Sequence, residues 1–429
     1  MEVKTNDENK RAVDLFIRKF IGTLKSPLSV KQYTKYENLV YISEILGSKY
    51  EDEQLVSKAN TYVGELVNDL NNGNYNMAGM FSEVGMLAFA VDTIYKKTGD
   101  LVNLTASLNN VLLQYGNYTV SNSKYKKLNT GMYDCISGVS GVLYYLLDTN
   151  IYLNNKDSMT DMIEYLINLT DTHLYKGKPV TNFHIENENL MREDEKNMFK
   201  DGTINFGLAH GMIGVLASLT KVYELQVYKD KDKILKSIHS ILDMYEKYVC
   251  YTDNISMYPT QLDYNEYISE DIIGLKNVCS WCYGNISNEL ILSKTYKVLG
   301  DDVNYNKHMN NLASIINQDD KRYNLSVPVL CHGYASVIAE QVSTYRYTQD
   351  DNFIKNIDRN ISKMFDLCDD VNRRIPDLKV EDLNPKIGLN VVQGHKDDLS
   401  MLCGSGGIFL SLLSVAVDNT RFQRLLMID

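Results

Sequence analysis

Three side chains that bind zinc well lie just before glycines at two places in the sequence. Cys282 lies two residues before Gly284, and Cys331 and His332 directly precede Gly333. Two thiolates and an imidazole form a set that holds a zinc ion and leaves its fourth position open. A cysteine on its own is more often a small buried hydrophobe, but the recurrence of these residue types before glycines favours a metal. We therefore predict one zinc ion per chain.

Two further cysteines are alternative ligands. Cys279 forms a Cys-x-x-Cys pair with Cys282, and a set that included it would be a closed, structural zinc site. Cys403 directly precedes Gly404, the same position that His332 takes before its glycine. A redox role for Cys-x-x-Cys is a third possibility, although no thioredoxin-like β-α-β pattern surrounds it. The preferred ligand set leaves Cys279 and Cys403 out.

Other reactive side chains occur at a similar position before a glycine. Asp134 lies four residues before Gly138, His210 directly precedes Gly211, and Tyr283 follows Cys282. Each also has a simpler explanation, because Asp134 could cap a helix, His210 could be a core histidine and Tyr283 could serve packing alone. Their common position favours one shared site, at the amino-terminal ends of several helices, where anions are stabilised.

A repeated Gly-x-x-Gly step, followed by an apolar run, organises most of the chain. Its first positions fall at residues 82, 138, 211, 284, 333 and 404, with serine replacing one glycine in three copies. Small residues in a first helical turn let neighbouring backbones approach closely, and the apolar runs predict buried helices. Amphipathic segments alternate with them. This pattern predicts an all-α fold, a closed α/α barrel (toroid) of inner and outer helices; an open solenoid is the alternative.

One region breaks the helical pattern. Residues 172–205 contain Gly177, Pro179 and a short alternating stretch, which predicts an insertion with some extended structure. Residues 251–271 form a second polar connector. No Gly/Ser-rich or Pro-rich linker divides the chain, so we predict a single α/α-barrel domain over residues 1–429 with the insertion at 172–205.

Composition excludes several classes of protein. The chain has 429 residues, a formal net charge of -11 and seven cysteines. The negative charge argues against a nucleic-acid partner, and no uncharged run is long enough for a membrane span. The polar amino-terminal segment does not resemble a signal peptide. We therefore expect reduced thiols and a cytoplasmic location.

Four motifs together resemble those of one family. They are Asp134–Gly141, Asn205–Gly211, Trp281–Gly284 and Cys331–Gly333, and in this order they resemble the motifs of the lanthionine synthetase C-like family, which includes the lantibiotic cyclases. The resemblance implies an α-barrel with zinc at one end, held by Cys282, Cys331 and His332. It also implies catalytic roles for Asp134, His210 and Tyr283.

The sequence departs from the family pattern at two positions. The family's cyclases have an arginine four residues before the first zinc cysteine, whereas this chain has Val278, and its nearest cation is Lys276. Asp134 therefore lacks the cationic neighbour that the resemblance implies. Cys403 is also unusual at its position.

The resemblance implies a zinc-dependent cyclase that acts on a dehydrated lantibiotic precursor. Peptide cysteine thiolates would add to dehydroalanine or dehydrobutyrine and form (methyl)lanthionine thioether rings. We expect His210 to be the general acid, with Tyr283 and Asp134 as orienting groups. Partners would be the dehydrated precursor peptide and a biosynthetic complex with a dehydratase and an exporter. Through these partners the protein could lie peripherally at the inner membrane face.

Two other functions fit part of the pattern. A prenyltransferase-like zinc enzyme also activates a peptide thiol, but it needs a cationic pocket for a diphosphate, and no Lys/Arg cluster lies near the motifs. A non-catalytic thiol- or peptide-binding member of the same family is favoured by Val278 alone.

Overall fold

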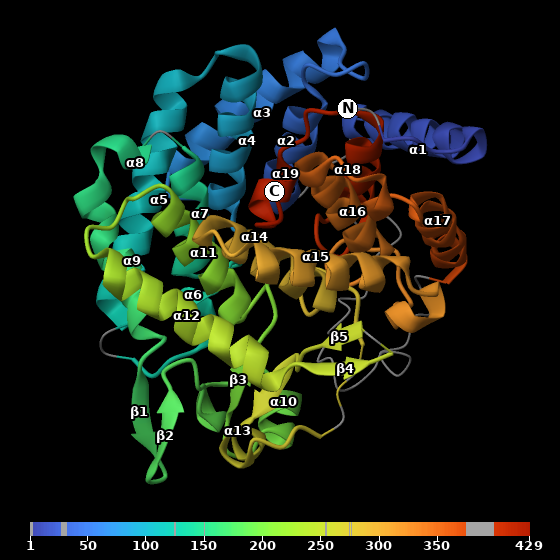
Figure 1. Cartoon of the computed structure of the whole chain (residues 1–429). Coiled ribbons are helices and arrows are strands. Elements are labelled where there is room, and N and C mark those ends of the chain that lie inside the picture. Colours follow the sequence, from blue (N-terminus) through green and yellow to red (C-terminus); the bar gives the residue numbers. More distant parts are fainter. Residues whose placement is uncertain are drawn as a thin grey trace. The chain divides into compact units, whose positions relative to one another are not determined.

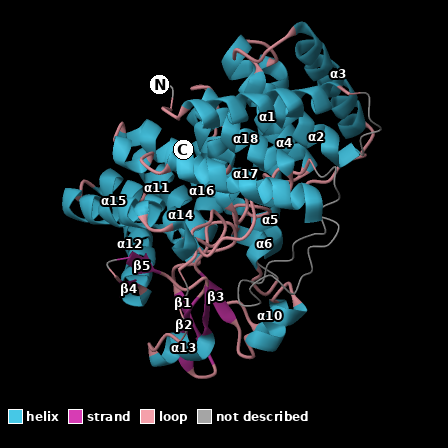
Figure 2. Ribbon diagram, turned by 90° about the vertical axis from the view of Figure 1, so that its right-hand side faces the viewer, coloured by secondary structure: helices cyan, strands magenta, loops and turns pink. Residues whose placement is uncertain are grey.

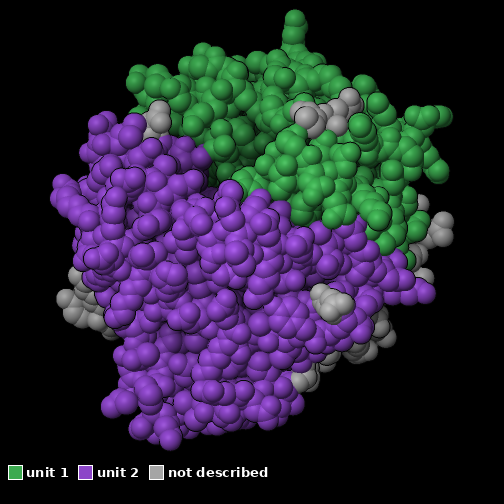
Figure 3. Space-filling view, in the orientation of Figure 1, with its two compact units in different colours: residues 1–108, 325–384, 389–429 green, residues 109–324, 385–388 purple. Residues whose placement is uncertain are grey.

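The computed structural model describes residues 3–26, 32–123, 126–149, 151–253, 255–273, 275, 277–374 and 399–429. Contacts divide the chain into two compact units (Figure 3). Unit 1 comprises residues 1–108, 325–384 and 389–429, and unit 2 comprises residues 109–324 and 385–388. The order of helices and strands along the chain can be followed in Figure 1.

Six helices begin directly after the first residue of the six Gly/Ser steps, at the places that the sequence predicts. Their first residues follow Ser82, Gly138, Gly211, Gly284, Gly333 and Gly404, and most of their side chains are buried. The six are α4 (Glu83–Thr98), α7 (Val139–Asp148), α11 (Met212–Glu224), α14 (Asn285–Leu299), α16 (Tyr334–Thr348) and α18 (Ser405–Ala416).

In unit 2, the buried helix α11 packs against both α7 and α14. Small hydroxyl side chains lie in these contacts. The Ser140 hydroxyl donates to the carbonyl of Gly214 at 2.8 Å, and the hydroxyls of Thr220 and Thr295 lie 3.0 Å apart. Because such residues satisfy their own polar atoms while allowing close helix approach, they fit a fully buried layer.

In unit 1, α16 packs against α18, which also contacts α1 (Asp7–Lys25) and α2 (Gln32–Ile45). The rings of Phe20 and Phe409 stack there with centroids 4.4 Å apart. Helix α2 is a further buried helix, since residues 36–46 are all buried, although no glycine step precedes it.

Amphipathic helices pair with the buried helices that precede them. Helix α12 shows the pattern best, because Ile234, Ile238 and Tyr245 are buried while its lysines lie on the other face. The pairs are α2 with α3 (Glu53–Asn71), α7 with α9 (Lys156–Asn168), α11 with α12 (Lys231–Tyr248), α14 with α15 (Asp302–Asn317), and α16 with α17 (Ile357–Arg374). Other helices are the long α5 (Val102–Ser123) and three short ones, α6 (Thr130–Tyr133), α8 (Ile151–Asn154) and α19 (Phe422–Leu425).

Unit 2 also contains all six described strands and the short helices α10 (Glu193–Met198) and α13 (Tyr264–Ser269). Strands β1 (Thr172–Tyr175) and β2 (Lys178–Thr181) form a hairpin, so the predicted insertion does contain extended structure. Strands β4 (Cys250–Thr252) and β5 (Ile255–Met257) form a second hairpin. Strand β3 (Thr203–Asn205) pairs with β6 (Gln261–Asp263), which joins the insertion to the later polar connector. Figure 2 shows β1, β2 and β3 near α13, and β4 and β5 near α12.

None of the helices in the described part of the chain is both long enough and apolar enough to cross a membrane. All seven cysteines lie within the described residues and carry thiols, not disulfides.

Candidate active site

Asp134 lies at the carboxyl end of α6, in the turn that leads into α7, and only 1% of its surface is exposed. Its Oδ1 accepts hydrogen bonds from the backbone amides of Ser137 at 2.7 Å and Gly138 at 2.8 Å. Its Oδ2 lies 2.6 Å from Nδ1 of His210. The carboxylate therefore has two roles, because it holds the turn that precedes a buried helix and also fixes the orientation of the imidazole. It does not cap that helix, since the N-cap residue of α7 is Gly138 and no side chain caps it.

The electrostatics of His210 follow from this pair. Burial disfavours the charged ring, but the hydrogen bond and negative charge of Asp134, helped by Glu195, outweigh it, so the pKa of His210 lies above its ordinary value. About a third of the His210 side chain is exposed (34%). With Nδ1 held by Asp134, Nε2 is the ring nitrogen left to exchange a proton with a bound molecule.

Backbone hydrogen bonds place three loops of unit 2 side by side. The amide of Cys135 donates to the carbonyl of Ala209 at 3.2 Å, and the amide of Ala209 donates to the carbonyl of Cys282 at 3.3 Å. The Tyr133 hydroxyl donates to the carbonyl of His210 at 3.0 Å. The amino-terminal ends of α7, α11 and α14 are thus joined through their preceding loops, as the common position of the reactive residues predicted.

Tyr283 completes the group, and its partner is a residue that sequence reasoning did not single out. Its ring centroid lies 6.3 Å from that of His210, and its hydroxyl accepts a hydrogen bond from Nδ2 of Asn205 at 3.0 Å. The signal was present, because Asn205 begins the motif that ends at Gly211. Gly207 allows the approach, since a Cβ there would lie 2.4 Å from the carbonyl oxygen of Cys282 and 2.5 Å from the Tyr283 ring.

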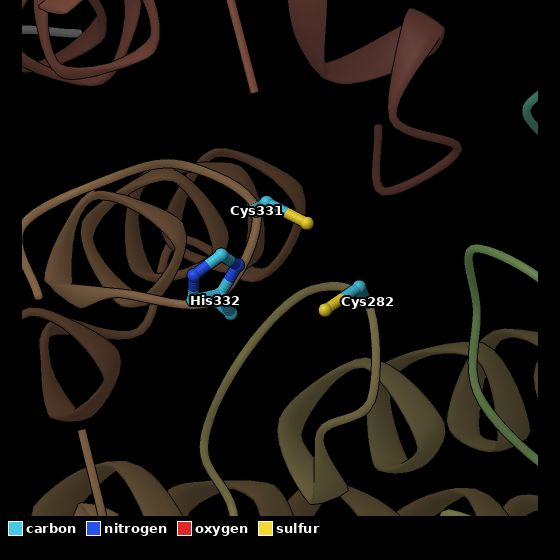
Figure 4. Close-up of side chains that lie close together, drawn as sticks. All are labelled: Cys282, Cys331 and His332. Atoms are coloured by element: carbon cyan, nitrogen blue, oxygen red, sulfur yellow. The ribbon is translucent and has the colours of Figure 1, made fainter. Parts of the chain in front are cut away.

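The predicted metal ligands also lie close together. The ligand atoms of Cys282, Cys331 and His332 are all within 4.8 Å of one another, and Figure 4 shows both sulfur atoms and the imidazole facing a common space. Among the described residues, no other set of three or more His, Cys, Asp or Glu side chains forms such a group. Two thiols and one imidazole match the ligand preference of zinc.

His332 provides a test of whether this set fits a metal. The residue is 6% exposed, and neither ring nitrogen has a hydrogen-bond partner. Burial lowers the pKa of His332 to about 4, so the imidazole is neutral near neutral pH. A buried imidazole without partners is costly, whereas a neutral ring is the form that coordinates a metal. The residues present therefore fit a zinc ion.

Comparison with known proteins identifies the family. The model of the family "Lanthionine synthetase C-like protein" matches residues 41–427. The chain belongs to this family.

Two known proteins are similar to this member of the lanthionine synthetase C-like family. The chain is 24% identical over 283 residues to the nisin biosynthesis protein NisC of Lactococcus lactis subsp. lactis, and the aligned part covers 66% of this chain and 65% of that protein's length. The solved structure of a nisin cyclase matches with a TM-score of 0.73 at 21% identity, covering 99% of this chain and 98% of the other. This match confirms the predicted all-α fold class, an α/α toroid.

In this lanthionine synthetase C-like chain, Cys279 and Cys403 are not part of the three-ligand group. The Sγ of Cys279 accepts a hydrogen bond from Nε2 of Gln318 at 3.1 Å and lies 3.8 Å from Oδ1 of Asn277. Asn277 in turn donates to Oε1 of Gln318 at 2.8 Å. Cys279, in the same loop as Cys282, is thus held within a polar network with Asn277 and Gln318.

Val278, the position at which the resemblance implies an arginine, is 3% exposed and lines a cavity of about 500 Å³. Lys276 lies outside the described residues. The hydrogen-bond partner of the Asp134 carboxylate is instead His210, which carries positive charge when protonated. Asp134 thus lacks the arginine that the resemblance implies, but its carboxylate has His210 as a partner instead.

Proposed function

We propose that this lanthionine synthetase C-like protein catalyses the closure of thioether rings in a dehydrated peptide. The observation that carries the proposal is the 2.6 Å hydrogen bond between Asp134 and His210. It supplies an oriented imidazole with a raised pKa, which is what a general acid near neutral pH requires. Membership of the family supports the same reaction class.

The reaction needs one proton to be delivered to carbon. A peptide cysteine loses its S–H proton, and its sulfur forms a bond to the β-carbon of dehydroalanine or dehydrobutyrine. The π electrons of the C=C bond move toward the α-carbon and its carbonyl as an enolate. His210 then donates a proton from Nε2 to the α-carbon, and the thiol proton restores the acid, so no oxidant or further reactant is consumed. Tyr283, held by Asn205, would orient the peptide.

Cys282, Cys331 and His332 would hold the metal, and we propose that it is zinc. When bound there, zinc would lower the pKa of the peptide thiol and make a thiolate available at neutral pH. The two cysteines place negative charge beside that thiolate, which should keep its sulfur nucleophilic. His332 supports the assignment through its buried, unpartnered ring.

The substrate would be a ribosomally made precursor whose Ser or Thr residues have been dehydrated. The name of NisC places that relative in nisin biosynthesis, which supports a peptide substrate here. By the same analogy, a dehydratase would precede this protein and an exporter would follow it, in one complex at the inner membrane face. We further propose that residues 1–429 act as one catalytic domain, with residues 172–205 as its insertion.

Ring formation on a dehydrated precursor tests the proposal. Because the addition leaves the peptide mass unchanged, each reaction is stopped with a thiol-alkylating reagent, and every ring formed leaves one thiol fewer to be labelled. Wild-type protein should protect thiols faster than the solution background under single-turnover conditions. A rate equal to the background would favour the alternative, a non-catalytic thiol- or peptide-binding member of the family, for which Val278 is the supporting feature.

The prenyltransferase-like alternative receives no support from the cavity next to the site. A diphosphate needs cationic side chains, whereas the described residues that line this cavity include Asp263, Glu266 and Asp271 and no Lys or Arg.

A further inference from the structure

The cavity beside Val278 combines an apolar surface with acidic groups. Its volume is about 500 Å³, and its apolar lining includes Phe199, Pro259, Ile273 and Val278. Val278 and Phe199 are buried, whereas Ile273 is 77% exposed. An isoleucine so exposed at the edge of a cavity offers apolar surface that a bound side chain would cover.

The acidic groups are held in place by the backbone around α13. Oδ1 of Asp263 accepts from the amide of Asn265 at 2.7 Å, and Oε1 of Glu266 accepts from the amide of Ile273 at 2.8 Å. Asp271 is exposed and adds a third carboxylate to the lining. Because three carboxylates line the cavity, this surface is complementary to a positively charged group.

Hydrogen bonds connect the lining of the cavity to residues that are adjacent in sequence to the candidate active site. The carbonyl of Thr260 accepts from the amide of Phe206 at 3.0 Å, and the amide of Tyr258 donates to Oδ1 of Asn285 at 3.1 Å. Val278 precedes Cys282 by four residues, which span at most about 14 Å of chain. A peptide with its cysteine at the site could therefore place a side chain in the cavity from within about four residues.

We propose that this cavity is a specificity site for an apolar residue of the substrate peptide that has a Lys or Arg beside it, within four residues of the reacting cysteine. The apolar side chain would lie against Val278 and Ile273, and the cation would face Asp271 and Glu266. Val278 is essential to the proposal, because an arginine at this position would fill the apolar lining with charge. The inference rests on the proposed function, since it names the sequence preference of that same reaction.

Two synthetic peptides test the preference on the full-length chain. Each has one dehydroalanine and one cysteine, with a Leu–Lys pair on both sides of the cysteine in the first peptide and a Ser–Glu pair in the second. Binding is measured on versions with alanine in place of dehydroalanine, so that no ring can form. We expect the Leu–Lys peptide to bind about tenfold more tightly, because burial of one leucine side chain contributes more than the free energy of a tenfold change.

Variants show whether the preference comes from this cavity. Ile273→Asp should remove most of the preference for leucine, and Asp271→Lys should remove most of the preference for lysine. Val303→Asp is the matched control, since Val303 is an exposed apolar residue (80%) of α15 that is not among the cavity's lining residues. Both test residues are exposed, so folding should be unaffected, and circular dichroism would verify it.

The outcomes separate this inference from the proposed function. Equal binding of the two peptides, absence of binding by both, or the same effect from Ile273→Asp and Val303→Asp would overturn the specificity site. If rings form at equal rates on both peptides, the specificity site fails while the cyclase assignment stands. If the binding preference is present and lost in Ile273→Asp, but neither peptide cyclises, the site is supported and the catalytic proposal fails.

Discussion

At the scale of single residues, Asp134 connects the turn before α7 to His210. One carboxylate oxygen accepts the backbone amides of Ser137 and Gly138, just before α7, and the other holds His210. The sequence left open whether Asp134 caps a helix or belongs to a site; it does not cap α7, whose N-cap residue is Gly138, and its role in a site stays a proposal. A substitution at this position must therefore be tested with a measurement that separates the two roles.

The pH dependence of the rate of ring formation distinguishes the effect of Asp134 on His210 from its effect on the backbone. Because Asp134 raises the pKa of His210, the acid form of the ring persists to higher pH than in an ordinary histidine, and the rate should fall as pH rises through this raised value. In Asp134→Asn, burial acts without the opposing charge, so the fall should move to lower pH. Single-turnover rates measured over a range of pH around neutrality give the pH at which the rate falls in each protein.

The matched control for this experiment is Asp157→Asn, an exposed carboxylate on α9. It should leave the profile in place. A profile that does not move in Asp134→Asn would show that Asp134 only supports the turn before α7.

Removal of the acid gives a second prediction. His210→Asn should lower the rate of ring formation by about 100- to 10,000-fold, the usual contribution of a positioned general acid, while zinc content and peptide binding stay unchanged. His239→Asn, an exposed histidine on α12, is the control. A wild-type rate in His210→Asn would transfer the acid role to Tyr283, and loss of zinc would make His210 a ligand or support.

The ligand set can be tested by metal analysis alone. Cys282→Ala, Cys331→Ala and His332→Ala should each lose zinc, because a three-residue site rarely retains the ion with two ligands. Cys279→Ser should retain it, since Gln318 and Asn277 surround that sulfur. Full zinc content in Cys331→Ala would refute the ligand set.

At the scale of elements, close loop approach at Gly207 is required for the site. A side chain there would contact both the Cys282 carbonyl and the Tyr283 ring. Gly207→Ala should therefore lower the free energy of unfolding by about 1–3 kcal/mol, the usual cost of overpacking, and reduce the rate as well. Chemical denaturation measures the first effect.

Gly64→Ala is the matched control for Gly207→Ala. Gly64 lies within α3, and a Cβ there would meet no other part of the fold within 4 Å, so alanine should stabilise the helix by up to about 1 kcal/mol. If both substitutions changed the free energy of unfolding in the same direction, close approach of the loops would not explain the glycine at position 207.

Elements with a local signal were predictable from the sequence, and elements with long-range partners were not. The Gly/Ser steps predict six helix starts, because each step is followed directly in the sequence by an apolar run. Helix α2 lacks this pattern, and its polar residues Glu37 and Glu44 are buried, accepting the amides of Met401 and Arg421. The β3–β6 pair joins segments far apart in sequence, and strands of three residues are too short to show a period.

The same distinction applies to the site. Cys282, Cys331, His332, Asp134 and His210 could be proposed because they share a position relative to glycines. The role of Asn205 could not, since its bond to Tyr283 depends on how two loops meet. The cavity at Val278 was also unpredictable, because residues from α10, β6, α13 and two loops form it.

At the scale of the whole molecule, the proposed metal should contribute to thermal stability. Its ligands come from the loops before α14 and α16, 49 residues apart in sequence between Cys282 and Cys331. A ligand that binds only the folded chain stabilises it by about 3–4 kcal/mol at 100 to 1,000 times its Kd. Treatment with a chelator should therefore lower the melting temperature by several degrees.

Variants make this prediction specific. Chelation should have no effect on the melting temperature of His332→Ala, which should already resemble the chelated wild type. An unchanged wild-type melting temperature, with zinc loss verified, would mean that the metal serves chemistry without supporting the fold.

The backbone bonds among the three loops of unit 2 have a consequence for motion. The amide of Cys135 donates to Ala209, and the amide of Ala209 donates to Cys282. The loop that contains Ala209 therefore cannot move far without breaking both hydrogen bonds. Hydrogen–deuterium exchange should therefore show these two amides opening in a single concerted event. A peptide product would then leave in one of two ways. It would follow a path on which these hydrogen bonds stay intact, or it would leave when all three loops open together.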